Sequence, residues 1–132
     1  FSNSESDDLG DYKEDYISKK ILFQLIEDTS LSAVKRMLAV FESETVKRVD
    51  SMIELIEKED WSNLGKEAHT LKSSAASYGA VTLSVLAEEI ERDVANSDAV
   101  DLKTKTASYL MLSSLGVKSL AQLKELLDAH NA

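Results

Sequence analysis

The chain has 132 residues, 24 acidic and 15 basic side chains, a net charge of −9, and neither cysteine nor proline. This length suits one domain, and the missing cysteines exclude disulfides, thiol nucleophiles and Cys-ligated zinc or iron–sulfur sites. The negative charge disfavours nucleic acid and anionic membranes as partners, and no apolar stretch approaches the roughly 20 residues that span a bilayer, so a protein partner is expected.

Residues 1–11 are rich in Ser, Asn, Asp and Glu and have little to bury, so we interpret them as a flexible acidic leader or linker. The chain does not begin with Met, which suggests a piece of a longer protein. The remaining residues, 12–132, follow a hydrophobic period near 3.6 without strand-like alternation. They are therefore expected to form one all-α domain.

The first three predicted helices are bounded by polar stop and cap signals. The first covers residues 12–27, and residues 28–30 supply its stop and the cap of the next helix. The second is long and runs to about Lys58. Asp60 is placed to cap the third, which ends at Gly79 because glycine accepts the left-handed conformation of a helix C-terminus.

The second half of the chain continues the helical pattern. A fourth apolar stripe over residues 83–94 breaks at residues 96–98, and another helix is expected over residues 102–112. Gly116 is interpreted as a kink or break before a last segment with leucines over residues 120–127. The predicted fold is an antiparallel four-helix bundle with one or two accessory helices.

The third predicted helix carries an exposed histidine. Its apolar seam consists of Trp61, Leu64, Ala68, Leu71, Ala75 and Tyr78. At about 100° per residue, His69 falls away from this seam and faces water. Its neighbours on that face are Gly65, Lys72, Ser73 and Ala76, all small except the exposed lysine. Because a mid-helix glycine costs about 1 kcal/mol relative to alanine, we expect Gly65, Ser73 and Ala76 to form a docking surface for another macromolecule.

The run AHTLKSSAASYGA, over residues 68–80, resembles the signature of the histidine-containing phosphotransfer (HPt) domain family. The matching positions are His69, Leu71, Lys72, Ser73, Ser74, Ala75, Gly79 and Ala80. The motif is most similar to those of bacterial quorum-sensing relay phosphotransferases and of HPt domains that end hybrid sensor kinases. A looser resemblance extends from about residue 21 to 91, and Ser73 replaces a glycine that many members have.

The resemblance implies that His69 accepts a phosphoryl group from the aspartyl phosphate of one receiver domain and passes it to the aspartate of another. Lys72 would stabilise charge, Glu91 on the next helix would hold the imidazole ring, and Gly79 would be structural. The chemistry agrees with this role, because a neutral imidazole keeps a lone pair on one ring nitrogen. Phosphoryl transfer then depends mainly on positioning and countercharge.

The resemblance also implies the partners and the cofactors. Receiver domains, and possibly a hybrid sensor kinase, would bind this chain in the cytoplasm, and the receiver would contribute Mg²⁺ while this chain binds no cofactor. The chain would be a phosphohistidine carrier without ATP-dependent kinase activity of its own. A monomer is expected, because one bundle uses all the apolar seams.

Other classes of function fit the sequence less well. Two histidines without a partnered motif argue against a metal or haem site, and neighbouring carboxylates such as Glu88 and Glu89 do not share a helical face. The dimerisation domain of a sensor kinase has an acidic residue after its histidine and a nearby proline, whereas here Thr70 follows His69 and proline is absent. The alternative that stays open is a non-catalytic helical adaptor that binds a protein through the small-residue face around His69.

Overall fold

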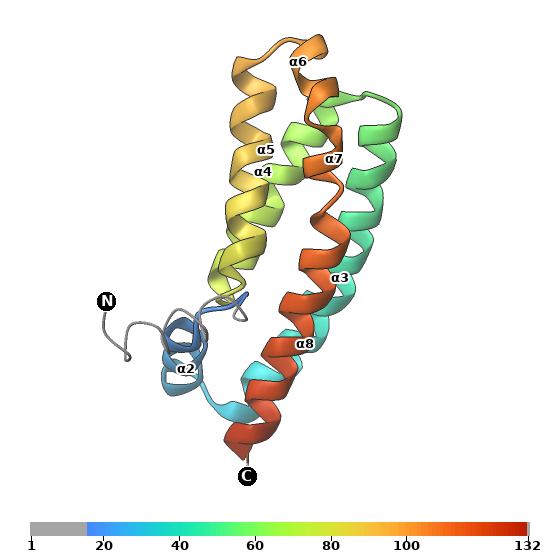
Figure 1. The fold of residues 1–132 in the computed structure, drawn as a ribbon. Coiled ribbons are helices and arrows are strands. Elements are labelled where there is room, and N and C mark those ends of the chain that lie inside the picture. The colour runs from blue at the N-terminus through green and yellow to red at the C-terminus, as the bar shows by residue number, and fades with distance from the viewer. Residues whose placement is uncertain (1–15, 132) are drawn as a thin grey trace, which may run out of the picture.

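The computed structural model describes residues 16–131, which contain helices and no strand (Figure 1). The helices are α2 (Lys19–Asp28), α3 (Leu31–Glu57), α4 (Trp61–Ser77), α5 (Val81–Asn96), α6 (Ala99–Thr104), α7 (Thr106–Tyr109) and α8 (Leu112–Asn131). The long helices α3, α4, α5 and α8 run alternately up and down, while α2 and α6 lie at opposite ends of the bundle (Figure 1). The predicted all-α four-helix bundle with accessory helices is confirmed. The leader expected over residues 1–11 lies outside the described residues.

Local cap signals set the ends of α3 and α4 as the sequence predicted. The Ser30 hydroxyl accepts a hydrogen bond from the Ala33 N–H at 3.0 Å, and an Asp60 carboxylate oxygen accepts one from the Asn63 N–H at 3.4 Å. Each cap satisfies a backbone donor that the first helical turn leaves open. After α4, Gly79 takes a φ of 84°, which reverses the chain towards α5.

The apolar faces of α3 and α4 form the centre of the core. Their fully or nearly buried members are Val34, Leu38, Phe41, Val49, Met52, Ile56, Leu64, Ala68, Leu71 and Ala75. Tyr78, at the end of α4, stacks on Phe41 with ring centroids 4.4 Å apart. Because the apolar side of α4 faces inward along its whole length, the opposite side of α4 is held open to solvent.

The predicted start of the first helix is wrong within the described range. Residues 12–15 lie outside the described residues, and α2 begins at Lys19 rather than including residues 16–18. Ser18 is extended, with a φ of −103° and a ψ of 111°, and its hydroxyl caps α2. Its N–H donates to the Gly79 carbonyl at 2.7 Å. The start of α2 is therefore fixed by a contact with the distant α4–α5 turn.

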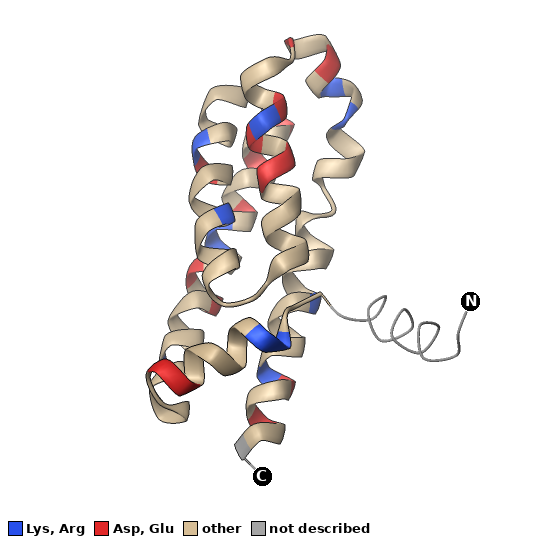
Figure 2. Ribbon diagram, turned by 90° about the vertical axis from the view of Figure 1, so that its left-hand side faces the viewer, with Lys and Arg blue, Asp and Glu red and all other residues tan. Residues whose placement is uncertain are grey.

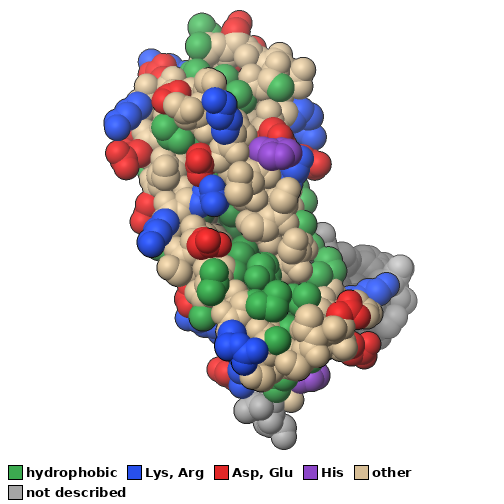
Figure 3. Space-filling view, turned by 180° about the vertical axis from the view of Figure 1, so that it is seen from behind, with side chains coloured by type: hydrophobic (Ala, Val, Ile, Leu, Met, Phe, Trp, Pro, Cys, Tyr) green, Lys and Arg blue, Asp and Glu red, His purple; other side chains and the backbone are tan. Residues whose placement is uncertain are grey.

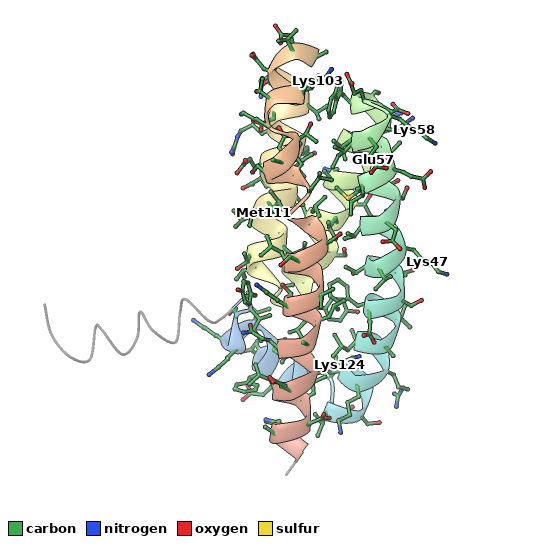
Figure 4. All side chains as sticks on the ribbon, turned by 45° about the vertical axis from the view of Figure 1, so that its right-hand side comes forward. Lys47, Glu57, Lys58, Lys103, Met111 and Lys124 are labelled. Carbon is green, nitrogen blue, oxygen red and sulfur yellow. The ribbon has the colours of Figure 1, made fainter. Side chains whose placement is uncertain are left out.

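The helix predicted over residues 102–112 is replaced by two short helices that break at Lys105 and again before Met111, which is exposed between α7 and α8 (Figure 4). The breaks accompany polar contacts with α5, which the apolar pattern of the sequence does not indicate. The buried carboxylate of Asp93 on α5 accepts a hydrogen bond from the Tyr109 hydroxyl at 2.6 Å and forms an ion pair with Lys105 at 3.2 Å. Both contacts draw this segment towards α5.

The kink or break predicted at Gly116 is wrong in that α8 continues through this residue. A methyl group built on Gly116 would meet a Val49 side-chain carbon at 3.8 Å, which is ordinary contact. The flanking residues Leu115 and Leu120 are both buried, so packing holds this part of α8 in place.

Acidic and basic residues are scattered along the helices (Figure 2). Arg48 of α3 binds Glu67 of α4 at 2.7 Å, and Lys103 of α6 lies 3.7 Å from Glu59 in the α3–α4 turn. Solvent-accessible pairs of this kind contribute at most about 1 kcal/mol each. Among the helices of residues 16–131, none has the length and hydropathy needed to cross a bilayer.

Candidate functional site

The middle of α4 holds His69 on the surface of the bundle. Ala68 and Leu71 on either side are fully buried, which fixes the rotation of the helix, and the His69 side chain is 63% exposed. In the space-filling view, one histidine lies open on the surface with acidic and basic side chains beside it (Figure 3). The backbone of His69 is therefore held in place by buried neighbours, while its imidazole is accessible to a large partner.

Glu91 of α5 joins the two other predicted site residues. Its Oε2 lies 2.6 Å from Nδ1 of His69, and its Oε1 accepts a hydrogen bond from Nζ of Lys72 at 2.7 Å. The structure thus brings His69, Lys72 and Glu91 into one connected group across the α4–α5 seam. Lys72 differs from its expected position on the open face, because its side chain is only 30% exposed and is paired with Glu91.

The electrostatics of this group keep its carboxylate and its ammonium charged. The hydrogen bond from Lys72, and then the one from His69, lower the pKa of Glu91 and outweigh the opposing effect of burial. The bond to Glu91 raises the pKa of Lys72, partly against desolvation. Near neutral pH, the ring of His69 therefore faces an anionic acceptor.

This contact selects one tautomer of the ring. A carboxylate anion accepts hydrogen bonds and cannot donate them, so Nδ1 of His69 carries the proton that points at Glu91. In the neutral ring, Nε2 then keeps a lone pair. The arrangement presents an oriented nitrogen nucleophile on an exposed helix face.

The α4–α5 seam is held by contacts that the sequence analysis did not identify. The Ser84 hydroxyl on α5 donates to the main-chain carbonyl of Lys72 at 2.9 Å. A methyl group on Gly65 would lie 2.9 Å from a methyl carbon of Val94, too close for ordinary packing. One signal could have found Ser84: it precedes Glu91 by two helical turns and so shares its face.

Gly65 therefore has a different reason to be glycine from the one expected. The close approach is made by Val94 of the same chain. Gly65 is half-buried at the edge of an open depression that is also lined by Ser62, Lys66, His69, Glu91, Val94 and Ala95. Ser73 and Ala76 are exposed further along α4, so all three predicted docking residues lie near the His69 face, and their docking role stays a prediction.

Gly79 has a clear structural basis. Its φ of 84° is disfavoured for residues with a side chain, and a methyl group there would lie 2.8 Å from the Ser18 carbonyl oxygen. The glycine thus permits both the turn into α5 and the contact with the start of α2.

The second histidine and the acidic residues do not assemble a metal centre in the described part of the chain. His130 packs against Phe23 with ring centroids 5.3 Å apart, and the two histidines occupy separate places on the surface (Figure 3). Within residues 16–131, no group of three His, Cys, Asp or Glu side chains could hold a metal ion.

Comparison with known proteins bears on the group formed by His69, Lys72 and Glu91. A family model described as Hpt domain matches residues 36–132. This range includes all of α4 and α5 and most of α3, but not α2. Searches of curated proteins and of solved structures gave no match.

Proposed function

The chain belongs to the Hpt domain family, which performs histidine phosphotransfer in phosphorelays, and we propose that His69 carries the phosphoryl group between receiver domains. The observation that most supports this assignment is the contact of 2.6 Å between Nδ1 of the exposed His69 and the Glu91 carboxylate. It leaves Nε2 as the free nucleophile on the open face of α4.

The proposed reaction begins with a receiver aspartyl phosphate. The Nε2 lone pair of His69 attacks phosphorus, a P–N bond forms, and the P–O bond to the receiver carboxylate breaks, with the electron pair leaving on that carboxylate. Because Nε2 carries no proton, the attack needs no general base. The reverse reaction with a second receiver passes the group on.

Lys72 is proposed to supply positive charge beside the reacting ring. It lies one helical turn after His69 and is held by Glu91 at 2.7 Å. The transferred phosphoryl group carries negative charge on its equatorial oxygens, which a nearby ammonium stabilises. We assign the Mg²⁺ of the reaction to the receiver.

The receiver is proposed to dock in the cytoplasm on the face of α4 around His69. Ser73 and Ala76 are exposed there, so Ala76→Trp should weaken receiver affinity without disturbing the core. Gly65→Leu is a poor probe of docking, because its side chain would collide with Val94 inside the bundle. Unchanged receiver affinity in Ala76→Trp would mean that the receiver docks on another surface.

A label-transfer experiment tests the function. The wild type, His69→Gln and the matched control His130→Gln are mixed with a radiolabelled, phosphorylated receiver and Mg²⁺. We expect acid-labile, base-stable label on the wild type and on His130→Gln, and none on His69→Gln. Receiver binding without label on any of the three proteins would contradict the proposal and favour the non-catalytic adaptor.

A further inference from the structure

The Glu91 carboxylate contacts the ring nitrogen that does not react. We propose that Glu91 keeps the proton on Nδ1 of His69 while Nε2 carries the phosphoryl group, and that this makes phospho-His69 a fast donor. The inference rests on the proposed function and adds a role for Glu91 beyond holding the ring in place.

The reason lies in the leaving group of the second transfer. When a receiver carboxylate attacks phosphorus, an O–P bond forms and the P–Nε2 bond breaks, with its electron pair staying on Nε2. If Nδ1 has kept its proton, the ring leaves as neutral imidazole. If Nδ1 has lost it, the ring must leave as imidazolate, a far stronger base and a poorer leaving group.

The two oxygens of Glu91 are occupied in a way that suits proton retention. Oε2 lies 2.6 Å from Nδ1, and Oε1 is bound to Lys72 at 2.7 Å. The ammonium makes the carboxylate a weaker base, and the lowered pKa of Glu91 agrees with this. Glu91 therefore attracts the ring proton without removing it, which distinguishes it from a general base.

Other charged side chains lie on this part of α4 and on α3 and α5, the helices packed against it. They are Lys66 and Lys72 on α4, Glu88 and Glu91 on α5, and the ion pair between Arg48 of α3 and Glu67 of α4. Lys66 and Lys72 oppose a positive ring, whereas the Arg48–Glu67 pair is self-compensating. Glu91 is in direct contact with Nδ1 and therefore dominates.

The test follows the loss of the phosphoryl group over a pH range. Wild type and Glu91→Gln are phosphorylated with phosphoramidate, a small donor that requires no receiver, and hydrolysis is followed from about pH 5 to 9. An opposite charge in contact with a titrating group shifts its pKa by about 1 to 3 units. We therefore expect the midpoint of the rate profile to lie about one pH unit higher in the wild type, with about tenfold slower loss from Glu91→Gln at pH 8.

Two references keep the test independent of folding defects. Circular dichroism reports whether Glu91→Gln is folded, and Glu91→Asp, which keeps the charge, should restore part of the shift. Concentrated urea unfolds the phosphorylated wild type and separates Glu91 from His69 without any substitution. The midpoint of its hydrolysis-rate profile should then fall to that of Glu91→Gln.

The outcomes separate this inference from the proposed function. If His69 is phosphorylated but folded wild type, unfolded wild type and Glu91→Gln share one midpoint, proton retention by Glu91 is wrong while the carrier function stands. If neither phosphoramidate nor a receiver phosphorylates His69, the proposed function fails and this inference fails with it.

Discussion

Glu91 and Asp93 lie two positions apart on α5, and each binds one lysine and one side chain with an aromatic ring. Glu91 faces α4, is 30% exposed and binds His69 and Lys72. Asp93 faces the interior, is 11% exposed and binds the Tyr109 hydroxyl and Lys105. The two carboxylates thus have similar partners and opposite surroundings.

The surroundings decide what each carboxylate does. Burial pushes the pKa of Asp93 up, but the bonds from Tyr109 and Lys105 outweigh it and the net shift is downward. Burial, followed by the bond to Asp93, raises the pKa of Tyr109. Removing Asp93 would leave a buried hydroxyl without an acceptor, whereas water can replace Glu91. The buried carboxylate therefore stabilises the fold, and the exposed one is proposed to act on the chemistry of His69.

The largest expected effect on stability comes from Asp93→Ala. It removes the acceptor of the buried Tyr109 hydroxyl and one end of an ion pair whose lysine side chain is 45% exposed, which together should lower the free energy of unfolding by about 3 kcal/mol. Urea denaturation measures this loss. The matched variant Glu91→Ala should hardly move the midpoint, and a larger loss from Glu91→Ala than from Asp93→Ala would reverse the comparison.

Acid should reproduce part of this loss in the wild type. Because the folded-state pKa of Asp93 is lowered, its contribution is fully present above its ordinary value of 3.8 and disappears as the pH falls through the folded-state pKa. The free energy of unfolding should therefore decrease from about pH 5 downward, more steeply in the wild type than in Asp93→Asn. Urea titrations at several pH values measure how the free energy of unfolding depends on pH in both proteins. Equal slopes would mean that Asp93 does not cause the loss of stability in acid.

Gly65→Ala should disturb the packing of α5 near Glu91 and lower the stability less than Asp93→Ala does. Its methyl group would press on Val94, and overpacking of about 1 to 3 kcal/mol exceeds the gain of about 1 kcal/mol in helix propensity. We expect a net loss of about 1 kcal/mol and slower phosphotransfer, because the seam that aligns Glu91 with His69 widens. Adding Val94→Ala should restore the transfer rate, and a single variant with normal transfer would show that the seam spacing is not critical.

Gly116→Ala is the smallest change and the control for Gly65→Ala. Its methyl group would make ordinary contact with Val49 at 3.8 Å, away from both carboxylates. Alanine should therefore raise the free energy of unfolding by about 0.5 to 1 kcal/mol and leave transfer unchanged. Thermal denaturation measures the gain, and a loss of stability would mean that α8 needs glycine for a reason that this contact does not show.

The features that could be predicted from the sequence depend on nearby residues. The caps at Ser30 and Asp60, the turn at Gly79 and the orientation of His69 follow from local chemistry and helical periodicity. The meeting of His69 with Glu91 required the family resemblance, because periodicity places each residue on its own helix but does not set the register between helices.

The features that could not be predicted depend on contacts between distant residues. The break at Lys105 accompanies the contacts of Lys105 and Tyr109 with Asp93. Position 65 is a glycine where Val94 leaves no room for a side chain. Apolar stripes contain no information on polar partners or on how closely two helices approach. The bond from Ser84 to the Lys72 carbonyl forms only once α4 and α5 have packed, although the spacing of seven residues places Ser84 and Glu91 on one face of α5.

The proposed role of Glu91 leaves Nε2 of His69 as the atom that carries the phosphoryl group. The most direct test is nitrogen and phosphorus NMR of the ¹⁵N-histidine-labelled protein before and after phosphorylation. We predict a proton on Nδ1 of His69 in the unmodified protein and a phosphorus coupling at Nε2 of His69 afterwards. Phosphorus on Nδ1 of His69, or on His130, would contradict the account.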